Sequence, residues 1–127
     1  MNILAVDFGT KNIGLAWSDT AMGMALPYGV IKNEVRAKAQ QELIKLVSTE
    51  RIDKVVVGLP FTMKGEDNNN TMKIRAWVEE IKLSLKVPVE FVDERFSSKQ
   101  ADRSKGGASR DEKSAMVILE SYLQQKR

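Results

Sequence analysis

Short apolar runs and turn residues alternate near the start of the chain, and this pattern predicts three β-strands. Residues 3–6 form an uninterrupted apolar run, as expected of a strand that is covered on both faces. Residues 13–17 and 26–31 predict two further strands, which short turns join as antiparallel hairpins. Because Pro27 lacks a backbone N–H, the third strand is expected to lie at an edge of the sheet.

From Glu34 onward the apolar positions follow helical spacing, and helices then alternate with strands. The apolar residues of the first helix are Val35, Ala39, Leu43, Leu46 and Val47, and those of the second are Ile74, Trp77, Val78, Ile81 and Leu85. A buried strand at 52–59 separates these helices, and Asn70 or Thr71 is expected to cap the second. A fifth strand at 87–92 precedes a last helix that runs to about Leu123. Residues 1–127 are expected to form a single domain.

The order of these elements predicts the topology of the sheet. Helices between the later strands imply right-handed crossovers, and such crossovers join parallel strands. The economical arrangement is a five-stranded mixed sheet, in which two parallel strands extend the three antiparallel ones in the order 3-2-1-4-5. This is the α/β plan of ribonuclease-H-like proteins, in which α-helices flank the sheet.

The composition restricts the chemistry mainly through two absences. The chain contains no histidine and no cysteine, which excludes imidazole bases, thiol nucleophiles, disulfides and zinc–thiolate sites. Hydrolytic chemistry would therefore need carboxylates, lysines, hydroxyls or a bound ion, and carboxylate-only sites suit hard cations such as Mg²⁺ or Mn²⁺. The net charge of +3 is compatible with a nucleic-acid partner but does not establish one.

The chain shows no sign of export or of membrane insertion. No apolar run approaches the roughly 20 residues that a membrane-spanning helix needs. Met1-Asn2-Ile3 leads directly into a strand-like run, without the basic region or cleavage site of a signal peptide. We therefore expect a cytoplasmic protein that does not associate with membranes.

Acidic residues follow two strands of the predicted sheet at the same edge. Asp7 follows the first strand, and Asp93 and Glu94 follow the fifth. One strand lies between these positions, so their backbones should be about 10 Å apart. Carboxylates at that separation can share two ions held about 4 Å apart, as in two-metal phosphodiester cleavage. The structural alternatives are an Asx turn at Asp7 and a solvated charge run at 93–95.

A third acid, Asp111, is expected in the first turn of the last helix. Ser109 and Glu112 form an S-x-x-E capping box, which begins the helix at Ser109. Asp111 then shares a face with Ala115 and Ile118, the face that packs against the sheet. A bound metal ion would compensate a buried charge there. The alternative is a first-turn acid that complements the helix dipole.

Four ordered segments resemble the motifs of the YqgF/RuvX family. They are residues 7–16, Val57-Gly58-Leu59-Pro60 followed by Gly65, Asp93-Glu94-Arg95-Phe96-Ser97-Ser98, and residues 111–119 with Ala115 and Ile118. This family consists of ribonuclease-H-like proteins that are related to Holliday junction resolvases and assigned to maturation of the small-subunit rRNA precursor. Asn12, the pair Ser97-Ser98, and Ser114 depart from the family's usual arginine, threonines and alanine, and the first departure removes one expected phosphate contact.

The resemblance implies a nuclease with Asp7, Glu94 and Asp111 as catalytic residues and metal ligands, and it selects Glu94 over Asp93. It implies Mg²⁺ or Mn²⁺ as cofactor, with two ions expected, Asp7 bridging them and the other two acids each holding one. The expected function is processing of the 5′ end of the small-subunit rRNA precursor. The alternatives are a Holliday junction resolvase of DNA recombination and repair, and a non-catalytic assembly factor that binds nucleic acid.

The Asp-x-Gly-Thr sequence at 7–10 also opens the ATP-binding lobes of sugar kinases, actin and Hsp70-like ATPases. Those proteins bind nucleotide between two such lobes, and a chain of 127 residues provides only one. We therefore rank an ATP-binding lobe below a nuclease. The pattern leaves open whether the protein is a monomer or a homodimer.

Cations close to the acids are candidates for contacts with precursor rRNA or branched DNA. Lys11 lies four residues after Asp7, and Arg95 follows Glu94 directly. A basic loop that contains glycine precedes Asp111, and its candidates are Arg103, Lys105 and Arg110. The alternatives are a solvated turn lysine, a pair between Arg95 and Asp93, and a disordered loop.

Overall fold

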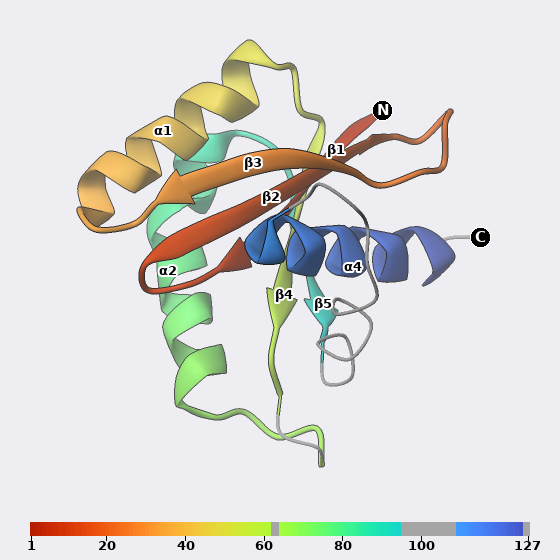
Figure 1. Ribbon diagram of the computed structural model, residues 1–127. Helices are drawn as coiled ribbons and strands as arrows, with labels where there is room; N and C mark the ends of the chain where they lie inside the picture. The colour runs from red at the N-terminus through yellow and green to blue at the C-terminus, as the bar shows by residue number, and fades with distance from the viewer. Residues whose placement is uncertain (62–63, 95–108, 126–127) are drawn as a thin grey trace.

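A mixed sheet of five strands forms the centre of the fold, in the order β3-β2-β1-β4-β5 (Figure 1). The structure is a computed structural model that describes residues 1–61, 64–94 and 109–125. The strands are β1 (Asn2–Phe8), β2 (Asn12–Asp19), β3 (Leu26–Lys32), β4 (Lys54–Leu59) and β5 (Val89–Asp93). β1 pairs antiparallel with β2 and parallel with β4. The order predicted from the sequence is confirmed, and β3, which contains Pro27, lies at an edge.

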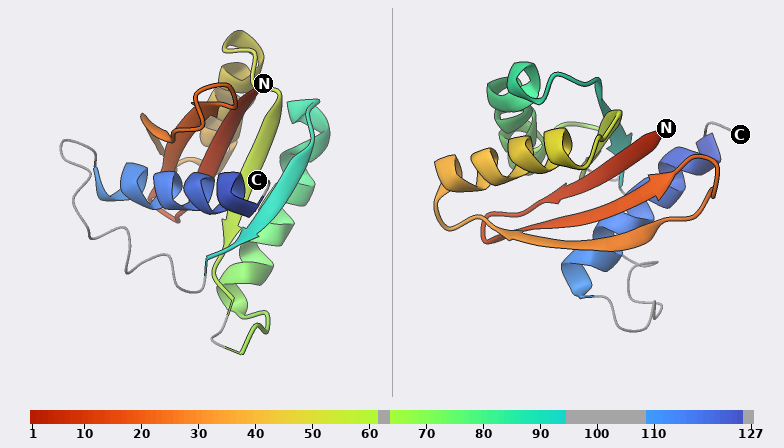
Figure 2. Two further views of the ribbon diagram at one scale, coloured as in Figure 1. Left: turned by 90° about the vertical axis from the view of Figure 1, so that its right-hand side faces the viewer. Right: turned by 90° about the horizontal axis from the view of Figure 1, so that it is seen from above.

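Helices cover both faces of this sheet. α1 (Arg36–Thr49) and α2 (Asn69–Leu85) pack on one face, and α4 (Arg110–Gln125) crosses the other (Figure 2). Successive residues of β1 point to opposite faces, so Leu4 joins the apolar cluster under α1 and α2, while Ile3 joins the cluster under α4. This arrangement explains why the first strand has a continuous apolar run.

The helix boundaries differ from the sequence predictions at two N-termini. Asn68, and not Asn70 or Thr71, is the N-cap of α2, and it forms a capping box with Thr71. The Asn68 side chain also donates to the carbonyl of Pro60 at 2.6 Å, and this tertiary contact distinguishes it from its asparagine neighbours. Val35 was expected on the buried face of α1 but is 60% exposed, because it is the extended N-cap residue that precedes the first turn.

The capping box predicted for the last helix is confirmed. The N–H of Glu112 donates to Ser109 Oγ at 3.2 Å, and the N–H of Ser109 donates to Glu112 Oε1 at 3.1 Å. α4 continues to Gln125, slightly beyond the predicted end. The capping box thereby sets where the first turn of α4, and with it Asp111, begins on the sheet.

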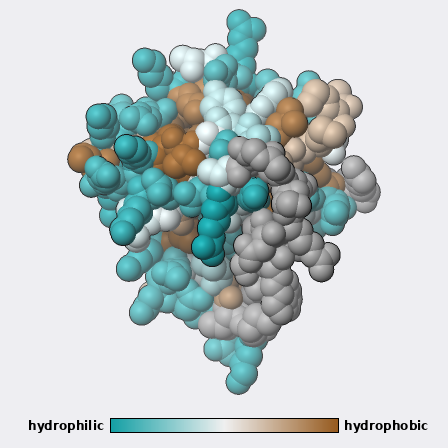
Figure 3. Space-filling model, in the orientation of Figure 1, coloured by the Kyte–Doolittle hydropathy of each residue, from teal (hydrophilic) through white to brown (hydrophobic). Residues whose placement is uncertain are grey.

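The face of the molecule shown in Figure 3 is largely hydrophilic, with apolar side chains in separate areas between the polar ones. In the described part of the chain, no helix combines the length and the apolar character that a membrane span requires.

Candidate active site

Asp7 lies on β1, one residue before the end of the strand. The sequence placed it just beyond the strand, but pairing of Phe8 with Ile13 continues the β1–β2 hairpin past it. The pKa of Asp7 is raised to about 6, mainly by burial and in addition by the negative charge of Asp111. A hydrogen bond from the Ser114 side chain acts in the opposite direction and lowers this pKa. Asp7 is therefore held in a poorly solvated position next to a second acid.

Asp111 reaches Asp7 because β2 carries no side chain at Gly14. Gly14 is the partner of Asp7 in the antiparallel register, and the first turn of α4 lies directly on it. A Cβ at Gly14 would lie 2.5 Å from the carbonyl carbon of Asp111 and closer still to its carbonyl oxygen, far inside van der Waals contact. A larger residue at this position would therefore move the first turn of α4 away from β1.

Glu94 approaches Asp7 from the other side, across β4. Its backbone N–H donates to the carbonyl of Leu59 at 3.1 Å, which extends the pairing of β5 with β4 by one residue. Gly58 leaves space for the carboxyl group, since a Cβ there would lie 2.8 Å from Glu94 Oε2. The pKa of Glu94 is raised to about 8, mainly by burial and in addition by the negative charges of Asp7 and Asp93.

The three predicted acids thus meet at one end of the sheet, and Asp7 interacts with both others. Among the residues that the structure describes, no three acidic side chains are arranged as a ready ion-binding group. The donor set is nevertheless oxygen only, as Mg²⁺ and Mn²⁺ prefer. A divalent cation beside Asp7 would also oppose the repulsion that raises the pKa of Asp7 and Glu94. The residues fit a divalent cation in chemistry and charge, and the side chains must move to enclose it.

A pocket of about 290 Å³ opens beside these acids. Its lining combines Asp7 and Glu94 with Phe8 of β1, Gly9 and Thr10 of the β1–β2 turn, Pro60 directly after β4, and Asn70, Lys73 and Ile74 of α2. It lies at the carboxyl ends of β1 and β4, between which the strand order reverses, and ligands bind at this place in α/β sheets. The sequence reasoning did not single out Lys73. Its position in the first turns of the helix after β4 was the available signal.

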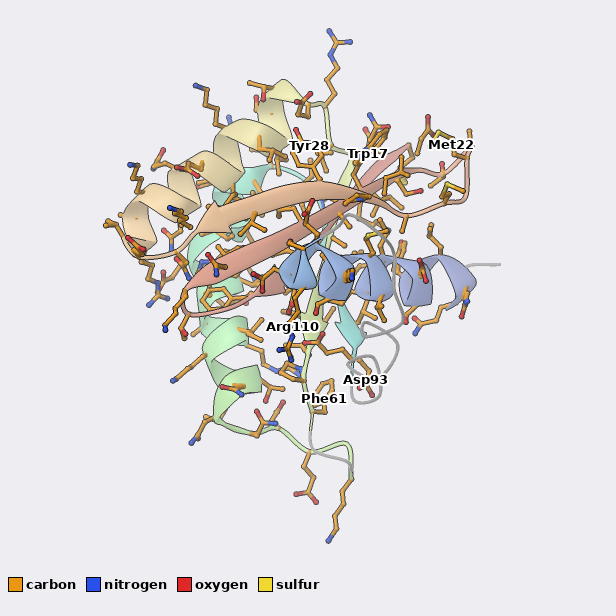
Figure 4. All side chains as sticks on the ribbon, viewed as in Figure 1. Trp17, Met22, Tyr28, Phe61, Asp93 and Arg110 are labelled. Atoms are coloured by element: carbon orange, nitrogen blue, oxygen red, sulfur yellow. The ribbon has the colours of Figure 1, made fainter. Side chains whose placement is uncertain are left out.

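The predicted cations are only partly within the described residues. Lys11 is exposed in the turn between β1 and β2, and it is not among the residues that line the pocket. Arg110 is exposed at the start of α4, on the same side of the molecule as Phe61 and Asp93 (Figure 4). Arg95, Arg103 and Lys105, and also Ser97 and Ser98, lie outside the described residues.

Comparison with known proteins points consistently to one family. The family model described as "RuvX: Holliday junction resolvase" matches residues 1–125. A protein of Maridesulfovibrio salexigens named "Putative pre-16S rRNA nuclease" is 33% identical over 97% of this chain and 98% of its own length. A protein of the same name from Nitratidesulfovibrio vulgaris is 36% identical over 97% of this chain and 93% of its own length.

Among solved structures, the RuvC protein of Thermus thermophilus in complex with a Holliday junction substrate has the same fold. The TM-score is 0.71 at 16% sequence identity, and the match covers 99% of this chain and 96% of that chain. The likeness confirms the ribonuclease-H-like architecture that the sequence predicted.

Proposed function

The chain belongs to the RuvX family, and on this basis we propose that it is a metal-dependent nuclease that processes the 5′ end of the small-subunit rRNA precursor. The convergence of Asp7, Glu94 and Asp111 at the carboxyl ends of the central strands is the observation that carries this proposal. Relatives that match almost the whole chain and are named for pre-16S rRNA cleavage support the choice of substrate.

In this proposal Asp7, Glu94 and Asp111 hold Mg²⁺ or Mn²⁺, with two ions bound. Such ions, when bound, supply an activated water and stabilise the charge on the entering and leaving oxygens of a phosphodiester. Ser114 orients the Asp7 carboxylate through its hydrogen bond. With a pKa of about 8, Glu94 keeps its proton at neutral pH, and cation binding would release that proton.

The remaining parts of the proposal concern substrate and location. Lys11, Arg95, Arg103, Lys105 and Arg110 would contact the phosphates of the substrate as point charges or forked donors. The protein would act as a single domain in the cytoplasm. Resolution of Holliday junctions is the second candidate function, which the description of the matching family model favours.

The decisive experiment offers labelled rRNA precursor and a four-way DNA junction to the protein side by side, with Mn²⁺. We expect cleavage near the 5′ end of the mature rRNA, loss of cleavage on chelation, and recovery with Mg²⁺ or Mn²⁺. Asp7→Asn should lower the rate by about 100-fold or more, because it removes a carboxylate that would hold the metal. Asp67→Asn, at an exposed acid paired with Arg75, is the matched control and should cleave normally.

Full activity of folded Asp7→Asn would refute the assignment of the site. Preferential cleavage of the junction would select the resolvase function. Binding of either nucleic acid without any metal-dependent product would identify a non-catalytic assembly factor.

A further inference from the structure

A second pocket of about 350 Å³ adjoins the pocket beside the acids. The residues that line this second pocket are Phe8, Thr10, Asn33, Glu34, Arg36, Lys73 and Ala76. Phe8, Thr10 and Lys73 line both pockets. Together the two pockets form a groove, called here the α2 groove, that leads from the acids between the β1–β2 turn and α2 toward the start of α1. An open groove of this kind suits a chain molecule better than an isolated small ligand.

Lys73 is the cation available to an anion in the α2 groove. Its side chain is exposed, and none of the ion pairs among the described residues involves it. Arg36, the other cation of the groove, is instead held by Glu80 at 2.7 Å. The first turn of α2 contains no acidic residue, so the positive end of the helix dipole adds to the charge of Lys73.

Asn33 fixes the opposite wall of the α2 groove. Its backbone N–H donates to the carbonyl of Lys11 at 2.8 Å, and its side-chain Nδ2 donates to the carbonyl of Gly9 at 2.9 Å. These two bonds hold the β1–β2 turn on both sides of Thr10. Asn33 is only 9% exposed, and its Oδ1 has no hydrogen-bond partner among the described residues. Asn33 thus holds the β1–β2 turn along the α2 groove from a buried position.

We propose that the α2 groove binds the nucleotide next to the scissile phosphate, and that Lys73 contacts the phosphate of that nucleotide. The inference rests on the proposed nuclease function, because it takes the strand to be cut beside Asp7 and Glu94 as the ligand. The negative charge of Asp7 repels an approaching polyanion, and a cation on the facing helix offsets this repulsion. Lys73 is thus a positioning residue for the strand, in addition to the cations predicted from the sequence.

The test measures binding separately from cleavage. Fluorescence anisotropy with a labelled single-stranded RNA from the precursor 5′ end, in the presence of chelator, gives the association constant at several salt concentrations. Lys73→Gln should weaken binding by about 3- to 10-fold and reduce the slope of log K against log salt by about 0.7, the value for one lost phosphate contact on a single strand. Lys73→Arg keeps the charge and should retain the slope.

Lys82→Gln is the matched control, since Lys82 lies on the same helix but pairs with Glu79 near the other end. Circular dichroism of each variant verifies folding. The inference is overturned if folded Lys73→Gln keeps the parent's affinity and slope, if Lys82→Gln loses as much, or if the parent does not bind the RNA. If the parent protein cleaves the RNA but Lys73→Gln binds it as tightly as the parent does, only the inference about Lys73 is overturned, and the nuclease proposal stands. If Lys73→Gln weakens binding but the parent protein never cleaves the RNA, only the nuclease proposal is overturned.

Discussion

At Gly58, the volume that a side chain would fill is taken by two other residues. A Cβ there would lie 2.8 Å from Glu94 Oε2 and 2.5 Å from Ile118 Cδ1. The glycine thus lets the carboxyl group of Glu94, the residue directly after β5, lie over β4 and face Asp7. In this way the missing side chain on β4 contributes to the position of an acid at the end of the neighbouring strand.

Gly58→Ala should therefore displace Glu94. We expect the cleavage rate to fall by about 10- to 100-fold, because small shifts of a catalytic group are costly, and the free energy of unfolding to fall by about 1–3 kcal/mol from overpacking. Time courses of cleavage measure the change in rate, and urea unfolding measures the change in the free energy of unfolding.

The double variant Gly58→Ala/Ile118→Val separates these effects, since valine lacks the Cδ1 atom that meets the new methyl group. It should recover part of the stability but not the activity. Recovery of full activity in the double variant would show that Ile118, and not the position of Glu94, limits cleavage.

At the scale of elements, the contact between β2 and the first turn of α4 brings two acids together. The capping box of Ser109 and Glu112 begins α4 at the position where Asp111 rests on Gly14. Asp7 is the register partner of Gly14, so this single helix–strand contact places Asp111 beside Asp7. Ala115, one turn further along α4 and fully buried against the sheet, continues the same close packing.

Gly14→Ala should push the start of α4 away from β2, because the new methyl group meets backbone atoms of Asp111 that cannot rotate aside. We expect a loss of about 2 kcal/mol or more in the free energy of unfolding, and a Mg²⁺ affinity that is weaker by at least about tenfold. Urea unfolding and isothermal titration calorimetry check these expectations. Unchanged Mg²⁺ affinity in a folded variant would contradict the role of this contact in the site.

At the scale of the whole molecule, the acids couple stability to pH. The folded-state pKa values of Asp7 and Glu94, about 6 and about 8, lie above their ordinary values of 3.8 and 4.5. Between the ordinary and the raised values the folded protein holds protons that the unfolded chain has released, so stability falls as pH rises. Any contribution of these two carboxyl groups to the free energy of unfolding is fully present at pH values below their ordinary pKa values. It is lost as the pH rises through their raised pKa values.

In the presence of chelator, the free energy of unfolding should therefore decrease between about pH 4 and about pH 8, by several kcal/mol. Mg²⁺ should reduce this decrease, because it binds the deprotonated acids of the folded protein and not the unfolded chain. Urea unfolding at several pH values measures both curves. The variant Asp7→Asn/Glu94→Gln should show a flatter curve in chelator, and a decrease equal to that of the parent would contradict the assignment to these two acids.

Local patterns in the sequence were sufficient for the sheet order. Three local features were enough: the apolar run at 3–6, the position of Pro27, and the change from strand-like to helical spacing at Glu34. Each depends on a few neighbouring residues only. Together with the general rules of strand connection they predict the order 3-2-1-4-5. The same rules placed Asp7 and Glu94 at one end of the sheet, since residues at the carboxyl ends of neighbouring strands must meet there.

Only the tertiary structure decided the features that depend on contacts between distant segments. Asn68 caps α2 because Pro60 accepts a bond from its side chain, whereas the adjacent asparagines have similar intrinsic capping ability. The missing side chains at Gly14 and Gly58 leave space that Asp111 and Glu94 occupy, and these two acids lie far from the glycines in the sequence. The proximity of Lys73 to the acids likewise depends on how α2 packs, and residue order alone does not encode that distance.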